Sequence, residues 1–257
     1  MKLAALAVLS AALVGLATAS TPTVSFGPAL AAPGDSLAIR VAGIGKARAR
    51  LVLDPGHIAL DPVFRARPGG VARFRAWVPN VLPGEYRLSV VRGARTLARG
   101  ARPLRIADPP PGVRECASSV YGDLGPDWER RARRAGPLAF VGAASGFSAE
   151  QVAQFRPLKV LVVVDNLHVV TLRVAREDRR AIALLYARRG RLGSFDSARV
   201  TGGLPAVRFE ACGPSEVPHT QFNGGFVVDR PLCAHFEVDV SGRREQIPVE
   251  IPFGVPC

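Results

Sequence analysis

The sequence predicts a mainly β protein with two antiparallel β-sandwich domains, the first immunoglobulin-like and the second carrying one or two short helices. Short runs of alternating apolar and polar residues recur along the 257-residue chain, which is typical of strands with one buried face. A proline-rich stretch at 109–112 separates two groups of such runs and is expected to be a semi-rigid linker. All four cysteines lie after that stretch. We therefore expect domains at 20–108 and 113–257.

Residues 1–19 are predicted to be a cleavable secretory signal peptide. Lys2 supplies a positive charge, the apolar run 3–16 follows, and Ala17-Thr18-Ala19 provides the small residues that a signal peptidase accepts. This run is shorter than the roughly 20 residues of a membrane-spanning helix, so an uncleaved anchor is only the alternative. No later run is apolar enough to span a bilayer. We expect a mature chain without a membrane span, secreted or held in the cell envelope.

The first domain is expected to hold about seven short strands, as in an immunoglobulin-type sandwich. Apolar residues alternate with small or polar ones at 37–41. The runs 63–67 and 71–77 flank Pro68-Gly69-Gly70, a turn sequence that predicts a hairpin between them.

Two turn-and-strand sequences of this domain resemble the immunoglobulin-like modules that are common in bacterial exported proteins. They are Pro33-Gly34-Asp35 and the run 83–90, in which Tyr86, Leu88 and Val90 share one face of a strand. The resemblance covers residues 30–106. It implies a spacer or binding module and brings no catalytic residue with it.

The second domain is expected to be a β-sandwich with a helical cap. A helix is predicted at 127–134, entered through Pro126, and a shorter one from Ser148, which has capping-box spacing to Gln151. A tight Asp165-Asn166 turn is expected to join two strands. The predicted strands are 159–164, 167–175, 181–187, 207–211, 222–228, 233–240 and 245–251.

The four cysteines, Cys116, Cys212, Cys233 and Cys257, predict two disulfides, because an even number in an exported chain usually pairs. Cys233 begins one strand of the last hairpin and Cys257 follows its partner strand, which favours the pairing Cys233–Cys257 with Cys116–Cys212 among three connectivities. No CxxC pair is present, so no structural zinc site is expected.

This part of the chain also resembles exported proteins of high-GC actinobacteria that have no known activity. The residues that carry the resemblance are the runs 136–140 and 220–226 and the spacing of the last three cysteines. Within the second run, Gly224-Gly225 interrupts a strand-like sequence, which predicts a bulge or, alternatively, a binding edge.

The chain is strongly basic, with a net charge of +13 and 31 arginines among its 34 basic residues. One interpretation is attraction to an anionic surface such as a cell-wall polymer or acidic polysaccharide, with nucleic acid a less expected partner. The alternative is a solvated, arginine-rich surface that reflects a GC-rich genome.

Two groups of residues are the candidate binding sites. In the 63–77 hairpin, Arg65, Arg67, Arg73, Arg75 and Trp77 are expected on one face, with Arg65 opposite Arg73, where like charges repel and an anion would relieve them. The alternative is a solvated face balanced by acids elsewhere.

The predicted 127–134 helix is the second candidate. Two favourable i,i+4 ion pairs within it leave Arg130 and Arg134 as a like-charge pair without an obvious local partner. A solvated helix face is again the alternative.

No catalytic residue, cofactor or metal site is expected from the sequence. His235, Glu237 and Asp239 alternate along one strand face and could bind a cation or act as an acid–base pair, but an exposed strand gives the same pattern. Ser145 lacks a nucleophile-elbow motif. Enzymatic activity is left undecided, and a binding or structural role in the envelope is favoured over a secreted hydrolase that uses two carboxylates.

Overall fold

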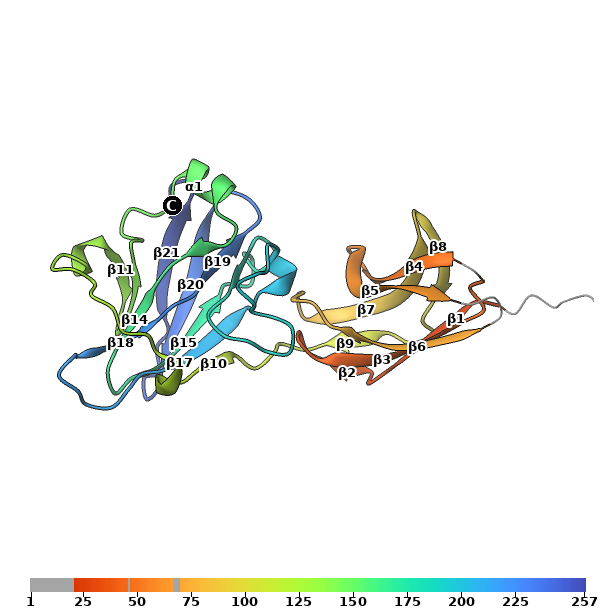
Figure 1. The fold of residues 1–257 in the computed structure, drawn as a ribbon, viewed down its shortest axis with the longest axis horizontal. Coiled ribbons are helices and arrows are strands. Elements are labelled where there is room, and N and C mark those ends of the chain that lie inside the picture. The colour runs from red at the N-terminus through yellow and green to blue at the C-terminus, as the bar shows by residue number, and fades with distance from the viewer. Residues whose placement is uncertain (1–20, 46, 67–69) are drawn as a thin grey trace, which may run out of the picture.

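A computed structural model describes residues 21–45, 47–66 and 70–257 of the chain. Two β-sandwiches lie end to end along the long axis of the molecule (Figure 1). Each has its own hydrophobic core, one drawn from residues between Val24 and Ile106 and the other from residues between Ala135 and Phe253. We call them the N-terminal unit and the C-terminal unit. The predicted signal peptide, residues 1–19, lies outside the described residues.

The N-terminal unit has the strand arrangement of an immunoglobulin-type sandwich. One sheet has the order β1-β3-β6 and the other β2-β9-β7-β4-β5, with β8 also beside β7. An immunoglobulin sandwich has strands A, B and E in one sheet and strands G, F and C in the other, which is the order of β1-β3-β6 and of β9-β7-β4. All ladders are antiparallel except the short β2–β9 pair. The strands are β1 (Thr23–Gly27), β2 (Leu30–Ala31), β3 (Ser36–Ala42), β4 (Ala47–Asp54), β5 (Ile58–Ala66), β6 (Val71–Trp77), β7 (Gly84–Arg92), β8 (Arg95–Arg99) and β9 (Leu104–Ile106).

Tyr86, near the start of β7, forms a tyrosine corner. Its side chain is buried, and its hydroxyl donates a hydrogen bond of 2.8 Å to the carbonyl oxygen of Leu82. A tyrosine at the start of strand F that bonds a few residues upstream is a hallmark of the immunoglobulin fold. Burial raises the pKa of this hydroxyl above the ordinary tyrosine value, which already keeps it protonated at neutral pH.

The predicted 63–77 hairpin is wrong. β5 pairs with β4 in one sheet and β6 pairs with β3 in the other, so the two runs face each other across the core. The stacked rings of Phe64 and Phe74, with centroids 4.7 Å apart, show why: both runs carry an inward aromatic residue, and the core lies between them. Residues 67–69 of the expected turn lie outside the described residues.

The C-terminal unit packs a five-stranded sheet, β10-β17-β15-β20-β21, against a layer made of β11-β12-β14-β18 and β13-β19-β16. The short β10–β17 pair is parallel, and the other ladders are antiparallel. The elements are β10 (Gly112–Arg114), β11 (Ala132–Ala135), β12 (Leu138–Val141), α1 (Ala149–Gln154), β13 (Leu158–Lys159), β14 (Val162–Asp165), β15 (Val169–Val174), β16 (Ile182–Leu184), β17 (Ala206–Glu210), β18 (His219–Phe222), β19 (Gly225–Val228), β20 (Leu232–Val240) and β21 (Ile247–Phe253), with 3-10 turns at Cys116–Ser118, Glu129–Arg131 and Val200–Gly202.

One of the two predicted helices is confirmed. α1 begins after Ser148, whose hydroxyl accepts from the Gln151 amide at 3.2 Å while the Gln151 side chain accepts from the Ser148 amide at 2.8 Å. This reciprocal pair is a capping box. The part of the chain that the structure describes contains no helix long and apolar enough to cross a membrane.

The predicted helix at 127–134 is wrong. A single 3-10 turn at Glu129–Arg131 leads into β11, which pairs with β12 across Gly136-Pro137. Gly136 has φ 59°, a conformation that glycine adopts easily and that closes this tight turn. An isolated helix of this length gains too few hydrogen bonds to compete with a paired strand.

The Asp165-Asn166 turn does not close a hairpin either, because β14 and β15 belong to different sheets. The side chain of Asn166 holds the chain where it passes from one sheet to the other. Its Nδ2 donates to Val217 O at 2.8 Å, and its Oδ1 accepts from Thr220 Oγ1 at 2.7 Å. Leu167 follows with φ 68°.

Gly224 and Gly225 mark a second crossing, between β18 and β19. A Cβ on Gly224 would collide with the Tyr186 ring, and one on Gly225 with the carbonyl oxygen of Leu158. The two glycines therefore allow close approach of this chain's own segments.

The favoured disulfide pairing, Cys116–Cys212 and Cys233–Cys257, is confirmed. The second bridge links the start of β20 to the segment after β21, at the open end of the predicted last hairpin.

Candidate functional site

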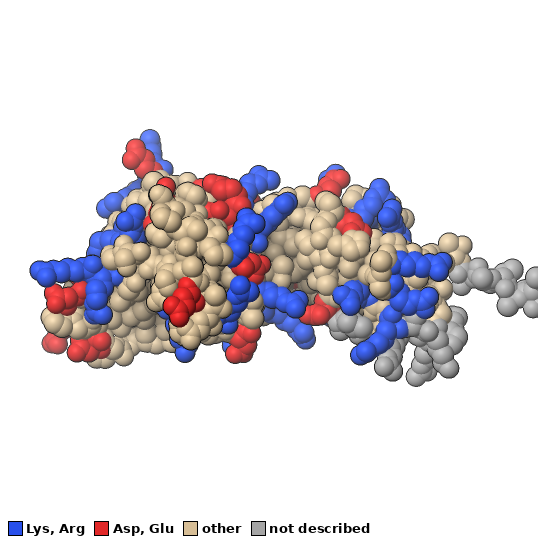
Figure 2. Space-filling view, turned by 90° about the horizontal axis from the view of Figure 1, so that it is seen from above, with Lys and Arg blue, Asp and Glu red and all other residues tan. Residues whose placement is uncertain are grey.

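The positive charge is concentrated on the N-terminal unit. Residues 20–108 contain 14 Lys and Arg but only five Asp and Glu, a net charge of +9, whereas residues 109–257 contain 19 and 16, a net charge of +3. Basic side chains gather at the end of the N-terminal unit that is remote from the C-terminal unit (Figure 2). Arginine is frequent in both parts of the chain, so the difference comes from the scarcity of acids in the first.

Three arginines on the outer surface of the β1-β3-β6 sheet form a cluster that we call the basic sheet face: Arg40, Arg73 and Arg75. Arg40 lies directly opposite Arg73 in the β3–β6 ladder, and all three side chains are exposed. Like charges in this position repel each other. Among the described residues, none of the three forms an ion pair with an acid.

A shallow cavity of about 420 Å³ lies on this face. None of the described residues that line it is acidic. The lining residues are Ser25, Phe26, Ala38, Ile39, Arg40, Arg73, Phe74 and Arg75. Three positive charges and no negative one make this concavity a place where an anion would be stabilised.

The structure divides the other residues of the predicted face. Arg65 lies on β5, in the opposite sheet, where Arg48 and not Arg73 is its cross-strand partner. Arg67 lies outside the described residues. Trp77 lies at the junction with the C-terminal unit, where the Arg191 guanidinium sits 5.8 Å from its ring centroid. Of the predicted residues that the structure describes, Arg73 and Arg75 share the basic sheet face.

Arg130 and Arg134 do have local partners, contrary to expectation. Arg134 contacts Asp165 at 3.1 Å and Glu129 at 3.7 Å, and Arg130 contacts Asp127 at 3.6 Å. β11 brings Arg134 to Asp165, a pairing that the predicted helix would not have made. Neither arginine adjoins the basic sheet face.

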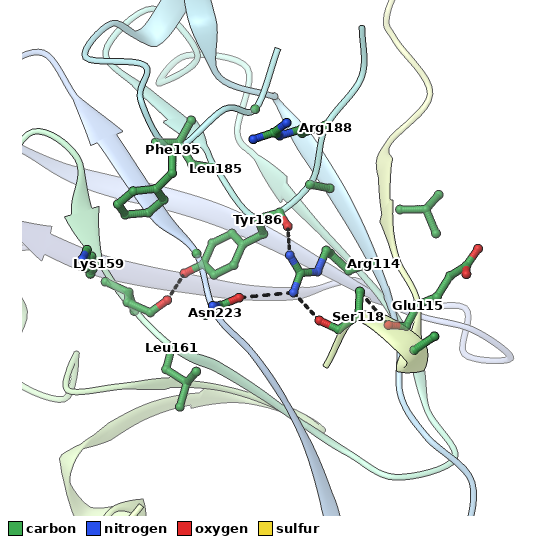
Figure 3. Close-up of a pocket in the computed structure, with 16 residues that line it drawn as sticks. Arg114, Glu115, Ser118, Lys159, Leu161, Leu185, Tyr186, Arg188, Phe195 and Asn223 are labelled. Atoms are coloured by element: carbon green, nitrogen blue, oxygen red, sulfur yellow. Dashed lines mark hydrogen bonds between the residues drawn. The ribbon is translucent and has the colours of Figure 1, made fainter. Parts of the chain in front are cut away.

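A cavity of about 910 Å³ in the C-terminal unit was not anticipated from the sequence (Figure 3). β10 and the turn after it form one side, and the segment that follows β16 forms the other. The lining residues are Val113, Arg114, Glu115, Ala117, Ser118, Lys159, Val160, Leu161, Leu185, Tyr186, Ala187, Arg188, Gly193, Phe195, Asn223 and Gly224. We call it the Arg114 cavity.

The guanidinium of Arg114 is held by neutral oxygens alone. It donates to Tyr186 O at 3.0 Å, to Ser118 O at 2.6 Å and to Asn223 Oδ1 at 3.3 Å (Figure 3). Its Nε is buried and has no hydrogen-bond partner. Burial lowers the pKa of Arg114, although arginine remains charged at physiological pH. The site therefore contains a partly desolvated positive charge that no carboxylate neutralises.

Two further cations line the Arg114 cavity, Lys159 and Arg188, against one acid, Glu115. The Lys159 ammonium lies 5.8 Å from the centroid of the Phe195 ring. Leu161 and Leu185 add apolar surface nearby (Figure 3). The cavity thus combines a net positive charge with an apolar wall.

No local motif in the sequence reveals this cavity, because Arg114 and Arg188 are far apart in the chain. The one available signal is Gly112, which directly follows the linker prolines. A Cβ there would lie 2.6 Å from Leu204 Cδ1 and 2.9 Å from the Ala187 Cβ. The glycine lets β10 pack closely against the segment that lines the cavity.

The strand face of His235, Glu237 and Asp239 does not form a cation site. Asp239 pairs with Arg173 at 2.9 Å, and His235 bonds through Nδ1 to Asp178 at 2.9 Å. The hydrogen bond to Asp178 raises the pKa of His235. His235 and Asp239 therefore take part in separate ion pairs.

Carboxylate-dependent hydrolysis finds no support in the Arg114 cavity. Glu115 is the only acid that lines it, whereas glycoside hydrolysis generally requires two facing carboxyl groups. Near the second disulfide, Glu250 lies close to Cys233 and Cys257, but both sulfurs are oxidised and cannot act as thiolate ligands.

No protein-family model matches the chain, and no curated protein matches it. Among solved structures, it is similar to the human OSCAR ligand-binding domain (13% identity over 90% of this chain and 94% of that one, TM-score 0.23). It is also similar to the D0-D1 domain of intimin, with 10% identity over 92% of this chain and 98% of that one and a TM-score of 0.24. A third similar structure is a putative membrane anchored protein from Corynebacterium diphtheriae, with 10% identity over 92% of this chain and 57% of that one and a TM-score of 0.26. These TM-scores are low, so the fold assignment rests on strand order and pairing.

Proposed function

We propose that this chain is an exported binding protein of the extracellular or envelope space that attaches to an anionic polymer through the basic sheet face. The observation that carries the proposal is the Arg40–Arg73 pair, two arginines opposite each other that form no ion pair with any acid among the described residues. A cell-wall polymer or acidic polysaccharide presents repeated negative charges. It would offset the repulsion between the arginines and gain several contacts at once.

The distribution of charge supports this function over a compositional origin. The N-terminal unit is shorter than the C-terminal one yet has three times its net charge, +9 against +3. A compositional bias toward arginine accounts for the basic residues of both units but not for the scarcity of acids in the N-terminal one. The two disulfides support export, because disulfides persist in oxidising compartments.

The test is retention of protein 20–257 on polygalacturonate beads and on cell-wall fragments that carry teichoic acid, over a series of salt concentrations. A variant with Arg40→Gln, Arg73→Gln and Arg75→Gln is compared with a control that carries Arg230→Gln, Arg243→Gln and Arg244→Gln. The control removes the same charge from exposed positions of the C-terminal unit. Neutral dextran beads report non-specific retention.

We expect the unmodified protein and the control to bind at low salt and to dissociate as salt rises, because salt screens exposed charges. The basic-sheet-face variant should be retained much less on both anionic supports. Equal loss in the two variants would mean that only net charge matters. No retention of the unmodified protein at low salt would overturn the proposal and favour a purely structural role or a protein partner.

A further inference from the structure

The Arg114 cavity has the features of a site for a small anion, separate from the basic sheet face. A guanidinium has five N–H donors, and three hydrogen bonds to protein are described for Arg114, which leaves two donors. One of them is the Nε–H, which is buried without a partner among the described residues and is closed off from the cavity. The donor left for a ligand is the second N–H of Nη1, on a guanidinium whose positive charge no carboxylate of the described residues pairs with.

The charges around the cavity indicate which kind of acceptor would bind Arg114. Arg114 is the partly desolvated cation of the cavity, while Lys159 and Arg188 are exposed at its edge and remain hydrated. A carboxylate has one negative charge and two acceptor oxygens, which matches one guanidinium. A phosphate dianion would lose more hydration for the same partner.

The apolar wall indicates the rest of the ligand. Phe195 offers a partly exposed aromatic ring and Leu161 a partly exposed aliphatic side chain, on which the C–H face of a sugar ring can pack. A volume of about 910 Å³ is within the range of small-molecule sites and accommodates a sugar dimer.

We infer that the Arg114 cavity binds one carboxylate-bearing sugar unit, such as a uronic acid, with its carboxylate on Arg114 and its ring against Phe195. The choice of a sugar rests on the proposed function, whereas the choice of a carboxylate rests on the cavity alone. The N-terminal unit would hold the polymer by many weak contacts, and the cavity would recognise one of its units.

The test is calorimetric titration of protein 20–257 with digalacturonate, compared with its neutral dimethyl ester and with galactose 1-phosphate. The variants are Arg114→Gln, Arg188→Gln and Phe195→Leu, with Arg176→Gln, an exposed residue outside the cavity lining, as the matched control. The melting temperature of each variant is measured first. Arg114→Gln removes the donor from three oxygens and could therefore fail to fold. In that case the affinities of Arg188→Gln and Phe195→Leu for digalacturonate test the inference.

We expect digalacturonate to bind at least 10-fold more tightly than either comparison ligand. Binding should weaken about 10-fold or more in Arg114→Gln, since hydrogen bonds to charged groups are the strong ones, and less in Arg188→Gln and Phe195→Leu. Equal binding of the ester, tighter binding of the phosphate, or unchanged affinity in the cavity variants would overturn the inference.

The variant that lacks Arg40, Arg73 and Arg75 separates this inference from the proposed function. It should keep full affinity for digalacturonate while losing retention on polymer beads. If the unmodified protein is retained on beads but does not bind digalacturonate, the inference fails and the proposed function stands. If the unmodified protein binds digalacturonate but is not retained on beads, the proposed function fails and the cavity inference stands.

Discussion

Arg189 of the C-terminal unit is bonded to Asp35 of the N-terminal unit. Its Nη2 lies 2.8 Å from Asp35 Oδ1, and its Nε donates to Pro33 O at 2.9 Å. Nearby, Asn80 donates through its backbone nitrogen to Thr201 O at 2.9 Å and through its amide to Val200 O at 3.2 Å. Gly34, which is buried in this junction, would clash with Arg189 if it carried a Cβ. The two units therefore meet through specific hydrogen bonds.

Replacing Arg189 with Ala should loosen this junction without unfolding either unit. The ion pair is partly exposed, so we expect a loss on the order of 1 kcal/mol in the free energy of docking the units. Small-angle X-ray scattering should show a broader distribution of distances than in the unmodified protein. Arg199→Ala, an exposed change in the same segment, should leave the distribution unchanged. An unaltered profile in Arg189→Ala would mean that Asn80 and the linker fix the junction alone.

Replacing Tyr86 with Phe should destabilise the N-terminal unit by about 1 kcal/mol. The substitution removes the hydroxyl that donates to Leu82 O and leaves the ring in the core. Urea denaturation should show a lower midpoint with an unchanged m value. Tyr121→Phe is the control, because Tyr121 is 86% exposed. Equal midpoints for the two variants would show that the tyrosine corner does not stabilise this sandwich.

The two disulfides should contribute unequally to stability. They close loops with sequence separations of 96 and 24 residues. The chain-entropy model gives about 1 kcal/mol more for the longer loop. Double Cys→Ser variants of each pair should therefore differ, with the Cys116–Cys212 variant less stable in chemical denaturation. The opposite order would indicate that contacts in the native state outweigh chain entropy.

His235 should make stability depend on pH. Its pKa is raised in the folded protein, first by the hydrogen bond to Asp178, so the protonated form is favoured on folding. This stabilisation is fully present below the ordinary histidine pKa of about 6.5 and is lost as pH rises through the raised value. The melting temperature of the unmodified protein should exceed that of His235→Gln by more at pH 5.5 than at pH 8.5. A gap that does not change between those values would contradict the assignment.

Local chemistry predicted much of the fold. Alternation at Leu37, Ile39 and Val41 identified β3, and the Ser148–Gln151 spacing identified the capping box of α1. Cys233 and Cys257 could be paired because they lie at the same end of one hairpin. In each case the decisive contacts are close in sequence or within a single hairpin.

The errors arose where the chain changes sheets. Pro68-Gly69-Gly70 and Asp165-Asn166 have the composition of hairpin turns, yet each joins strands of different sheets. Turn residues specify a local change of direction, but the choice of sheet depends on distant partners such as Thr220 for Asn166. The Arg114 cavity was missed for the same reason, because Tyr186 and Asn223, which hold Arg114, come from remote segments.

The segment between β16 and β17 is shared by the junction and the Arg114 cavity. Arg189, Val200 and Thr201 attach it to the N-terminal unit, and Arg188, Gly193 and Phe195 line the cavity. Arg188 and Arg189 are neighbours in the chain, so a single peptide bond separates a residue of the cavity wall from one that holds the N-terminal unit.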